Sequence, residues 1–186
     1  FDIVSIQFAL HYMFENRKSL HSFMKNVSDY TKLGKYFIGT CYDGKKIYEE
    51  MKNKKYGEKS ELYIKNKKIW HVTKLYDNSN ESFLDDEETS LGYKIKVYQE
   101  TINKDFEEYL VNFDFFRDYM EKNGFKLMSP TVKKRYSKIF KQNNITNGFG
   151  DFGKVINHLS ELQDGDRELQ KDGYYEGAMD ILKSTT

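Results

Sequence analysis

The hydrophobic pattern opens with a nearly continuous apolar run over residues 1–10. Its rings and β-branched residues are typical of a buried strand in a parallel sheet that is covered on both faces. A buried strand needs neighbours on both sides, so we expect the chain to belong to a longer domain. The alternative is a complete domain that begins with an edge strand.

A helical pattern follows this run. One apolar stripe at helical spacing is formed by Leu20, Phe23, Met24, Val27 and Tyr30. Asn16 stands where a helix N-cap is expected, and Gly34 follows the end of the stripe. Residues 36–41 then predict a second buried strand. A strand, a helix and a strand joined by short links make a βαβ unit, which predicts parallel pairing.

The middle of the chain changes character. Residues 69–76 and 93–99 alternate apolar with polar positions, which predicts antiparallel strands with one wet face. We therefore expect an antiparallel insertion over residues 56–103. A polar helix is expected before it, over residues 43–55, and the acidic link at residues 77–92 is expected to be a solvated or mobile loop.

A last amphipathic helix is predicted by Phe113, Phe116 and Met120, with Gly124 at its end. Residues 125–128 then predict a short strand. Together these elements predict an α/β fold with parallel strands first and an antiparallel insertion after them.

Composition removes several classes of protein. The 186 residues carry 30 Lys and Arg against 29 Asp and Glu, a net charge of +1, so bulk charge does not mark a nucleic-acid or membrane-surface protein. A single cysteine, Cys41, excludes an internal disulfide. No apolar run approaches the ~18 residues of a membrane span, so we expect no membrane partner. The bias of 26 Lys over 4 Arg indicates a low-GC source.

Candidate chemistry follows the first strand, because ligands of open α/β sheets lie beyond the carboxyl ends of the strands. Gln7, Phe8, His11 and Tyr12 bring an amide, an imidazole and two rings together within a few residues. Such groups suit a planar, hydrogen-bonding heterocycle, which they would stack on and pair with. The alternative is ordinary core packing with a satisfied histidine.

A second candidate is the acidic pair of Glu107 and Glu108, which directly precedes an apolar stretch. A carboxylate that enters a pocket accepts from two adjacent N–H groups, such as N1–H and the exocyclic amine of guanine. The alternative is that these acids are solvated in front of a helix.

Other motifs do not indicate a binding site once their neighbouring residues are considered. The glycines of residues 148–153 follow a polar loop, which argues against a dinucleotide site, and the acids of residues 164–168 lack the glycine of a calcium loop. No histidine or cysteine has metal-ligand spacing. The basic, aromatic stretch of residues 133–141 either contacts a phosphate backbone or forms a solvated face.

At this point the motifs resemble a known family. Residues 1–15, with the core Gln-Phe-x-x-His-Tyr, resemble the fourth strand and following loop of mRNA cap guanine-N7 methyltransferases. Residues 36–40 and 108–113 resemble the next strand and the Glu-aromatic-Leu-Val segment of that family. The sequence of these motifs is most similar to that of the capping enzymes of giant viruses. The resemblance implies a class I, Rossmann-like methyltransferase that uses S-adenosylmethionine, with this chain forming the C-terminal half of the sheet.

The resemblance also implies roles for single residues. Gln7, Phe8 and Tyr12 would contact the methyl donor, while Phe8, His11, Tyr12 and Glu108 would hold the cap guanine. Glu108 would accept from guanine N1 and N2. No residue would act as a general acid or base, because the N7 lone pair attacks the sulfonium carbon without losing a proton.

Partners and location follow from the same resemblance. The substrate would be the capped 5′ end of mRNA, GpppN, with guanylyltransferase and triphosphatase modules upstream in the same polypeptide. A viral protein would act in the cytoplasmic virus factory or the virion, and a cellular one in the nucleus.

The chain also departs from the family pattern. The glycine-rich turn that cradles the methyl donor would lie before residue 1, and the closing aromatic of the family's terminal strand is missing from this C-terminus. We therefore expect the chain alone to be inactive. Two alternatives stay open: a non-catalytic stimulatory subunit or binding module of a capping enzyme, and a small-molecule methyltransferase that uses S-adenosylmethionine.

Overall fold

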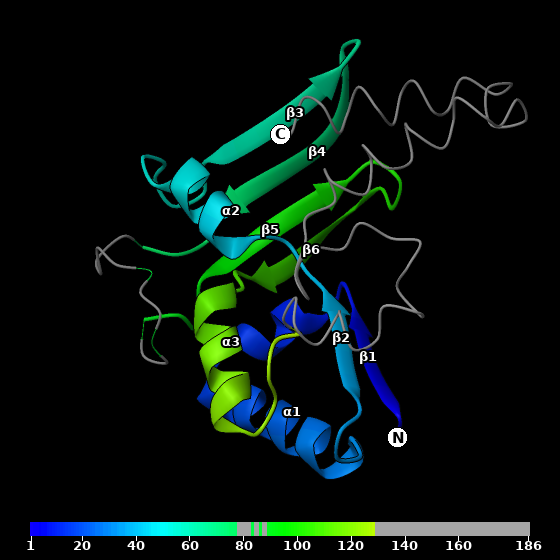
Figure 1. Ribbon diagram of the computed structural model, residues 1–186. Helices are drawn as coiled ribbons and strands as arrows, with labels where there is room; N and C mark the ends of the chain where they lie inside the picture. Colours follow the sequence, from blue (N-terminus) through cyan, green and yellow to red (C-terminus); the bar gives the residue numbers. More distant parts are fainter. Residues whose placement is uncertain (78–82, 84–85, 87–88, 129–186) are drawn as a thin grey trace, which may run out of the picture. The chain divides into compact units, whose positions relative to one another are not determined.

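The computed structural model describes residues 1–77, 83, 86 and 89–128 (Figure 1). Of these, Phe1–Lys126 belong to one unit, and the fold is described for that unit. The motifs at residues 133–141, 148–153 and 164–168 lie outside the described residues. None of the described helices is long and apolar enough to cross a membrane.

The chain begins with the expected βαβ unit. Strand β1 (Ile3–Gln7) is followed by the short 3-10 helix η1 (Leu10–Phe14), helix α1 (Arg17–Tyr30) and strand β2 (Tyr36–Thr40). The two strands pair in parallel, from Ile3 opposite Tyr36 to Gln7 opposite Thr40. Asn16 caps α1 as predicted, since its side-chain oxygen accepts from the Ser19 N–H at 3.0 Å.

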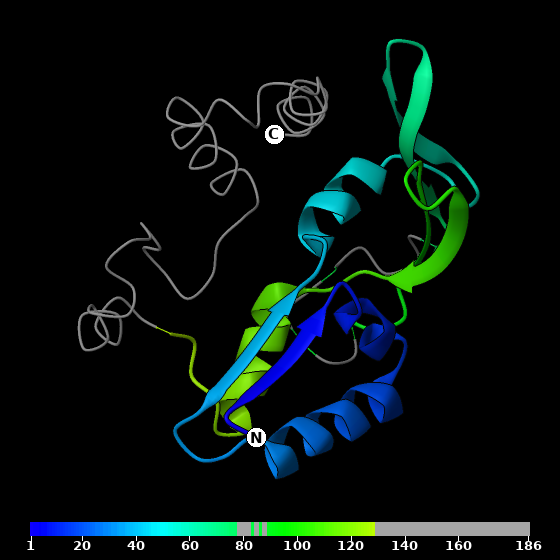
Figure 2. The same ribbon diagram turned by 90° about the vertical axis from the view of Figure 1, so that its right-hand side faces the viewer.

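One face of the β1–β2 pair is covered. Figure 2 shows helix α3 (Phe113–Lys122) behind the two strands and α1 beside them. Between strands and helices lies an apolar cluster whose buried members include Leu20, Met24, Val27, Phe115, Phe116 and Met120. Asn112 caps α3 by accepting from the Phe115 N–H at 3.2 Å. The amphipathic helices expected here are confirmed.

The other face of the pair is open, so the prediction of two strands buried on both faces is wrong for the chain as it stands. Ile3 is 58% exposed and Ile38 is 49% exposed. Side chains alternate between the two faces of a strand, and in the described unit the helices cover only the face of Val4 and Ile6.

The second sheet is antiparallel, with the order β3-β4-β5-β6. Its strands are β3 (Lys59–Ile64), β4 (Lys67–Lys74), β5 (Lys94–Gln99) and β6 (Lys104–Tyr109). Helix α2 (Gly44–Met51) packs its Ile47, Tyr48 and Met51 against the inner face of this sheet, in a cluster with Val72, Ile95 and Val97. Figure 1 shows α2 beside the sheet.

Two contacts join α2 to its surroundings. The Gly44 N–H donates to the Val111 carbonyl at 3.1 Å, and a Cβ at Gly44 would stand only 2.6 Å from the Val111 nitrogen. At the other end of α2, the buried Lys74 Nζ donates to the carbonyl oxygens of Met51 at 2.9 Å and Lys54 at 2.7 Å. Lys74 thus holds the carbonyl end of the helix and the turn after it.

Several expectations need correction. Helix α2 ends at Met51, although the pattern extended it to residue 55. Residues 125–128 form no strand. The link at residues 77–92 is not wholly solvated, because Phe83 and Ser90 are buried. Phe83 packs on Tyr48 and Tyr93, with ring centroids 5.2 and 4.9 Å apart, so the three rings form one aromatic cluster.

Candidate functional site

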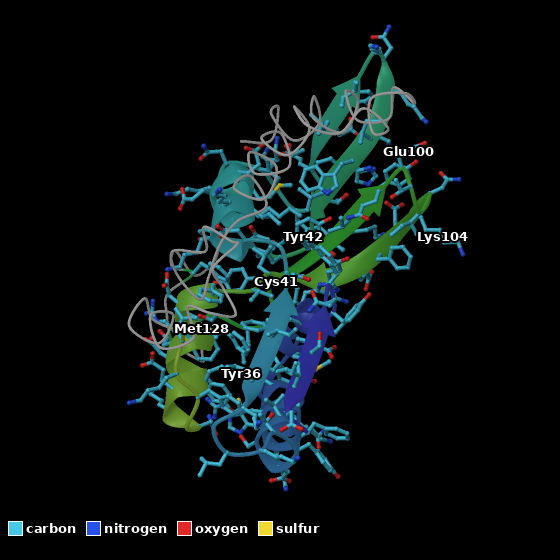
Figure 3. All side chains as sticks on the ribbon, turned by 45° about the vertical axis from the view of Figure 1, so that its right-hand side comes forward. Tyr36, Cys41, Tyr42, Glu100, Lys104 and Met128 are labelled. Carbon is cyan, nitrogen blue, oxygen red and sulfur yellow. The ribbon has the colours of Figure 1, made fainter. Side chains whose placement is uncertain are left out.

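A pocket of about 340 Å³ opens where the parallel pair meets the antiparallel sheet. Its walls are Phe8, His11, Tyr12, Tyr42, Val97, Gln99, Ile102, Phe106 and Glu108. Figure 3 shows Tyr42 just past the tip of β2, beside the antiparallel sheet. The pocket thus lies beyond the carboxyl ends of β1 and β2, where α/β folds place ligands.

The first wall follows the end of β1. Phe8 takes a left-handed backbone conformation, with φ of 49°. Its N–H is held by Thr40, at 3.0 Å to the carbonyl oxygen and 3.1 Å to Oγ1. This turn leaves the Phe8 ring 54% exposed. Helix η1 then carries His11 and Tyr12, whose rings meet edge to face with centroids 4.2 Å apart.

The second wall is the β5–β6 hairpin. Strand register places Glu108 opposite Ile95 and Phe106 opposite Val97, so both side chains face the pocket. Glu107 points to the other face, where it forms an ion pair with Lys94 at 2.9 Å. The two neighbouring acidic side chains therefore lie in different environments. Glu107 is the solvated acid that one interpretation expected, and Glu108 is the buried carboxyl that the other expected, at 8% exposure.

His11 and Glu108 meet inside the pocket. His11 Nδ1 lies 3.6 Å from Glu108 Oε2, which is too long for a hydrogen bond. Neither His11 nitrogen, nor Glu108 Oε2, has a hydrogen-bond partner among the described residues. The alternative of a satisfied core histidine is therefore not what the structure shows. A buried polar group without a partner costs about 1–3 kcal/mol, and such groups mark functional sites.

Burial also shifts the protonation of this pair. Removal from water lowers the pKa of His11 to about 4 and raises the pKa of Glu108 to about 7. At neutral pH the imidazole is therefore uncharged, and the carboxyl is poised between its two forms. An incoming group that donates hydrogen bonds to Glu108 favours the carboxylate.

Four of the five predicted site residues line this one pocket: Phe8, His11, Tyr12 and Glu108. Gln7 does not. Its amide lies on the open face of the β1–β2 pair, where Nε2 donates to Ser5 Oγ at 2.9 Å and Oε1 accepts from Thr40 Oγ1 at 2.8 Å. These two bonds satisfy the polar group that the sequence places in an apolar strand.

Sequence reasoning missed five lining residues: Tyr42, Val97, Gln99, Ile102 and Phe106. The end of the second strand was a place to look for a ligand, and Tyr42 stands there, two residues past β2. Phe106 gave no such signal, because β6 itself was not predicted. Gln99 donates its amide N–H to the Tyr42 hydroxyl, which joins the two walls.

The described residues around this pair supply neither a metal site nor an activated thiol. No cluster of three or more His, Cys, Asp or Glu side chains that would hold a metal ion occurs in the part of the chain that the structure describes. Burial raises the pKa of the nearby Cys41 thiol to about 11, so it is not a nucleophile at neutral pH. The arrangement is therefore one for binding: exposed rings on one side and a buried carboxyl that accepts N–H donors on the other.

Comparison with known proteins agrees with this geometry. The chain matches the mRNA (guanine-N(7))-methyltransferase domain family over residues 1–181. It is 25% identical over 181 residues to the mRNA cap guanine-N(7) methyltransferase of Cryptococcus neoformans, and 29% identical over 181 residues to that of Schizosaccharomyces pombe. It is also 25% identical over 158 residues to a protein of Acanthamoeba polyphaga mimivirus named "Probable mRNA-capping enzyme".

The chain belongs to the mRNA (guanine-N(7))-methyltransferase domain family. The matches cover 97%, 94% and 78% of this chain, in the Cryptococcus, Schizosaccharomyces and mimivirus comparisons respectively. In the same order, they cover 25%, 46% and 13% of the relatives. The chain thus spans less than half the length of these proteins. The sequence resemblance to cap methyltransferases, including one to a giant-virus capping enzyme, is confirmed.

Proposed function

We propose that the pocket binds the guanine of an mRNA cap, and that the protein methylates this guanine at N7. The single observation that carries the proposal lies in a ring-lined pocket: buried Glu108 Oε2 and both nitrogens of the neighbouring His11 have no hydrogen-bond partner among the described residues. Family membership supplies the reaction, and the pocket supplies a place for its acceptor base.

Guanine fits the chemistry of this wall. Its Watson–Crick edge presents two neighbouring N–H donors, N1–H and the exocyclic amine, to a carboxylate. A carboxylate that accepts both bonds is stabilised in its ionised form, which offsets the burial that raises the pKa of Glu108. Phe8 and Tyr12, at 54% and 44% exposed, offer ring faces and edges to the flat base.

The methyl donor would bind on the β1 side of the pocket, in a Rossmann-like domain of which this chain forms part. Gln7, Phe8 and Tyr12 are exposed at the carboxyl end of β1, so they fit a donor that approaches from that side. S-adenosylmethionine supplies a methyl group on a positively charged sulfur. Within this chain Phe8 and Tyr12 would wall the boundary between donor and base.

Catalysis would rest on position and electrostatics. Guanine N7 carries a lone pair and no proton, so no general base is needed to free it. Uncharged His11 and the Glu108 carboxylate would hold the guanine in position without moving its protons. In the complete protein the substrate would be GpppN at the 5′ end of mRNA, made by guanylyltransferase and triphosphatase modules of the same polypeptide.

The test separates two neighbouring carboxylates. GTP, which carries the unmethylated guanine, is titrated into the 186-residue chain, and binding is followed by calorimetry and by the fluorescence of Trp70, its single tryptophan. Glu108→Ala should weaken binding about 100-fold, because a charged acceptor of two hydrogen bonds is lost. Glu107→Ala, which changes only the opposite face, should bind as the wild type does.

Equal binding by the two variants would refute the guanine pocket. In the full-length protein, Glu108→Ala should also abolish methyl transfer to GpppRNA. Guanine binding without any methyl transfer by the full-length protein would instead favour a non-catalytic subunit.

A further inference from the structure

The pocket contains one polar pair that the proposed function leaves unused. Tyr42 follows β2 and Gln99 ends β5, and both line the pocket together with Glu108. Tyr42 is half-buried, and its hydroxyl accepts a hydrogen bond from the Gln99 amide. Figure 3 shows Tyr42 where the two sheets approach each other.

The surroundings of Tyr42 leave its hydroxyl proton available. A phenol oxygen has one proton to donate and two lone pairs that accept. The Gln99 amide already donates to this oxygen, and burial raises the pKa of Tyr42, so the hydroxyl keeps its proton at neutral pH. With one lone pair occupied by Gln99, the hydroxyl of Tyr42 can donate that proton to a ligand.

Tyr42 also lines the same pocket as Glu108, the carboxyl that would bind the guanine edge. On guanine, the atom next to N1–H is the keto oxygen O6, which is an acceptor. A ligand that gives N1–H and its amine to Glu108 therefore brings O6 beside the same edge.

We propose that the Tyr42 hydroxyl donates a hydrogen bond to the 6-keto oxygen of the bound purine, with Gln99 holding Tyr42 in that role. The inference rests on the proposed function and adds a specificity residue to it. Adenine carries an amine at position 6, so a phenol that donates its proton would face another donor there. The pocket would then select guanine over adenine at two points, Glu108 and Tyr42.

The experiment changes one atom on each side of the bond. Wild type, Tyr42→Phe and Tyr98→Phe are titrated with GTP, ATP and 6-thio-GTP, whose sulfur is a poor acceptor. Tyr98 is the matched control, because its hydroxyl donates to Asn103 at 3.1 Å and it lies next to Gln99 on the opposite face of β5. Tyr42→Phe should bind GTP about 3- to 10-fold more weakly, the usual loss for one hydrogen bond.

The effects of Tyr42→Phe and of replacing O6 by sulfur on binding affinity should not be additive. Tyr42→Phe should leave the affinity for 6-thio-GTP unchanged, and its preference for GTP over ATP should fall by the same factor of about 3 to 10. Equal weakening for GTP and 6-thio-GTP would overturn the contact with O6, and so would wild-type affinity for GTP. Tyr98→Phe should match the wild type throughout.

A different result marks failure of the proposed function. If the wild type does not bind GTP, or binds it as well after Glu108→Ala, the guanine pocket is wrong and the role of Tyr42 falls with it. If Tyr42→Phe does not fold, as judged by circular dichroism, Gln99→Leu decides. This change frees a lone pair of Tyr42, so it should lower the preference for GTP over ATP, and an unchanged preference would overturn the proposal.

Discussion

The two sheets treat polar groups in opposite ways. On the β1–β2 pair, the Gln7 amide is exposed and both of its ends are bonded, to Ser5 and Thr40. On the antiparallel sheet, Glu108 is buried, and its Oε2 has no hydrogen-bond partner within the described part of the chain. The polar side chain on the open sheet has its hydrogen bonds, whereas the one on the covered sheet is buried without one, which costs free energy of folding. That cost falls where the pairing of β6 with β5, and the contact of β6 with η1, hold the side chain in position.

The two walls of the pocket also differ in how firmly their side chains are held. Phe8 and Tyr12 are exposed rings on a turn and a short helix, which follow the parallel pair. Glu108 and Tyr42 are held by strand register and by a hydrogen bond between side chains. A rigid wall suits recognition of one base, while an open wall leaves room for a second molecule to approach it.

The largest effect is expected from Gly44→Ala, which would push the two walls apart. The added Cβ would collide with the backbone of Val111, which cannot move as a flexible side chain can. The free energy of unfolding in urea should fall by about 3 kcal/mol or more. Gly57→Ala is the control, because nothing lies within 4 Å of its Cβ, and its positive φ should cost about 1 kcal/mol. Similar losses in both variants would contradict this role for Gly44.

The next effect comes from the pH dependence of stability. Glu108 has a folded pKa of about 7 against a usual 4.5, so the folded state binds more protons and its stability falls as the pH rises through this range. His11 has a folded pKa of about 4 against a usual 6.5, so its contribution to stability rises with pH from 4 to 6.5. In the wild type the two contributions oppose each other.

In each single variant, the pH dependence of stability should therefore come from the remaining residue of the pair. Relative to the wild type, Glu108→Gln should gain stability as the pH rises from 4.5 to 7, and His11→Ala should lose stability as it rises from 4 to 6.5. Each change should approach about 3 kcal/mol over its range, since one pKa unit is worth about 1.4 kcal/mol. Urea unfolding at several pH values measures it. Parallel pH curves for all three proteins would show that burial does not shift this pair.

The smallest effect on stability is expected from Phe8→Ala. The ring is 54% exposed, so the free energy of unfolding should change by less than about 1 kcal/mol, whereas GTP binding should weaken about 10-fold through lost contact with the base. Phe14→Ala, in the same segment but fully buried, should show the opposite pattern and cost about 3–5 kcal/mol of stability. A Phe8 variant that binds GTP normally would remove that ring from the site.

The elements that were predicted from sequence are those whose buried faces are apolar. Helices α1 and α3 carry apolar stripes and polar caps, and β1 and β2 are apolar runs separated by a helix. Strands β4 and β5 alternate clearly. In each case the pattern that gives the local structure also gives the packing, so the two agree.

Strands β3 and β6 were missed for different reasons. The β3–β4 turn uses Lys65 and Asn66 at φ of 47° and 65°, without the glycine that usually marks such a turn. In β6 the buried position holds Glu108, so the alternation that predicts a strand is broken by the residue that makes the pocket. The contact between Tyr42 and Gln99 depends on how the sheets meet, which no local pattern contains.

The buried ammonium of Lys74 has a consequence for chemical probing. Its nitrogen is held by two carbonyl oxygens at the end of α2, and burial lowers its pKa. An amine-reactive reagent can reach it only when the end of α2 lifts from β4. The labelling rate of Lys74, read by mass spectrometry against exposed lysines of the same chain, therefore reports how often this end of the helix opens.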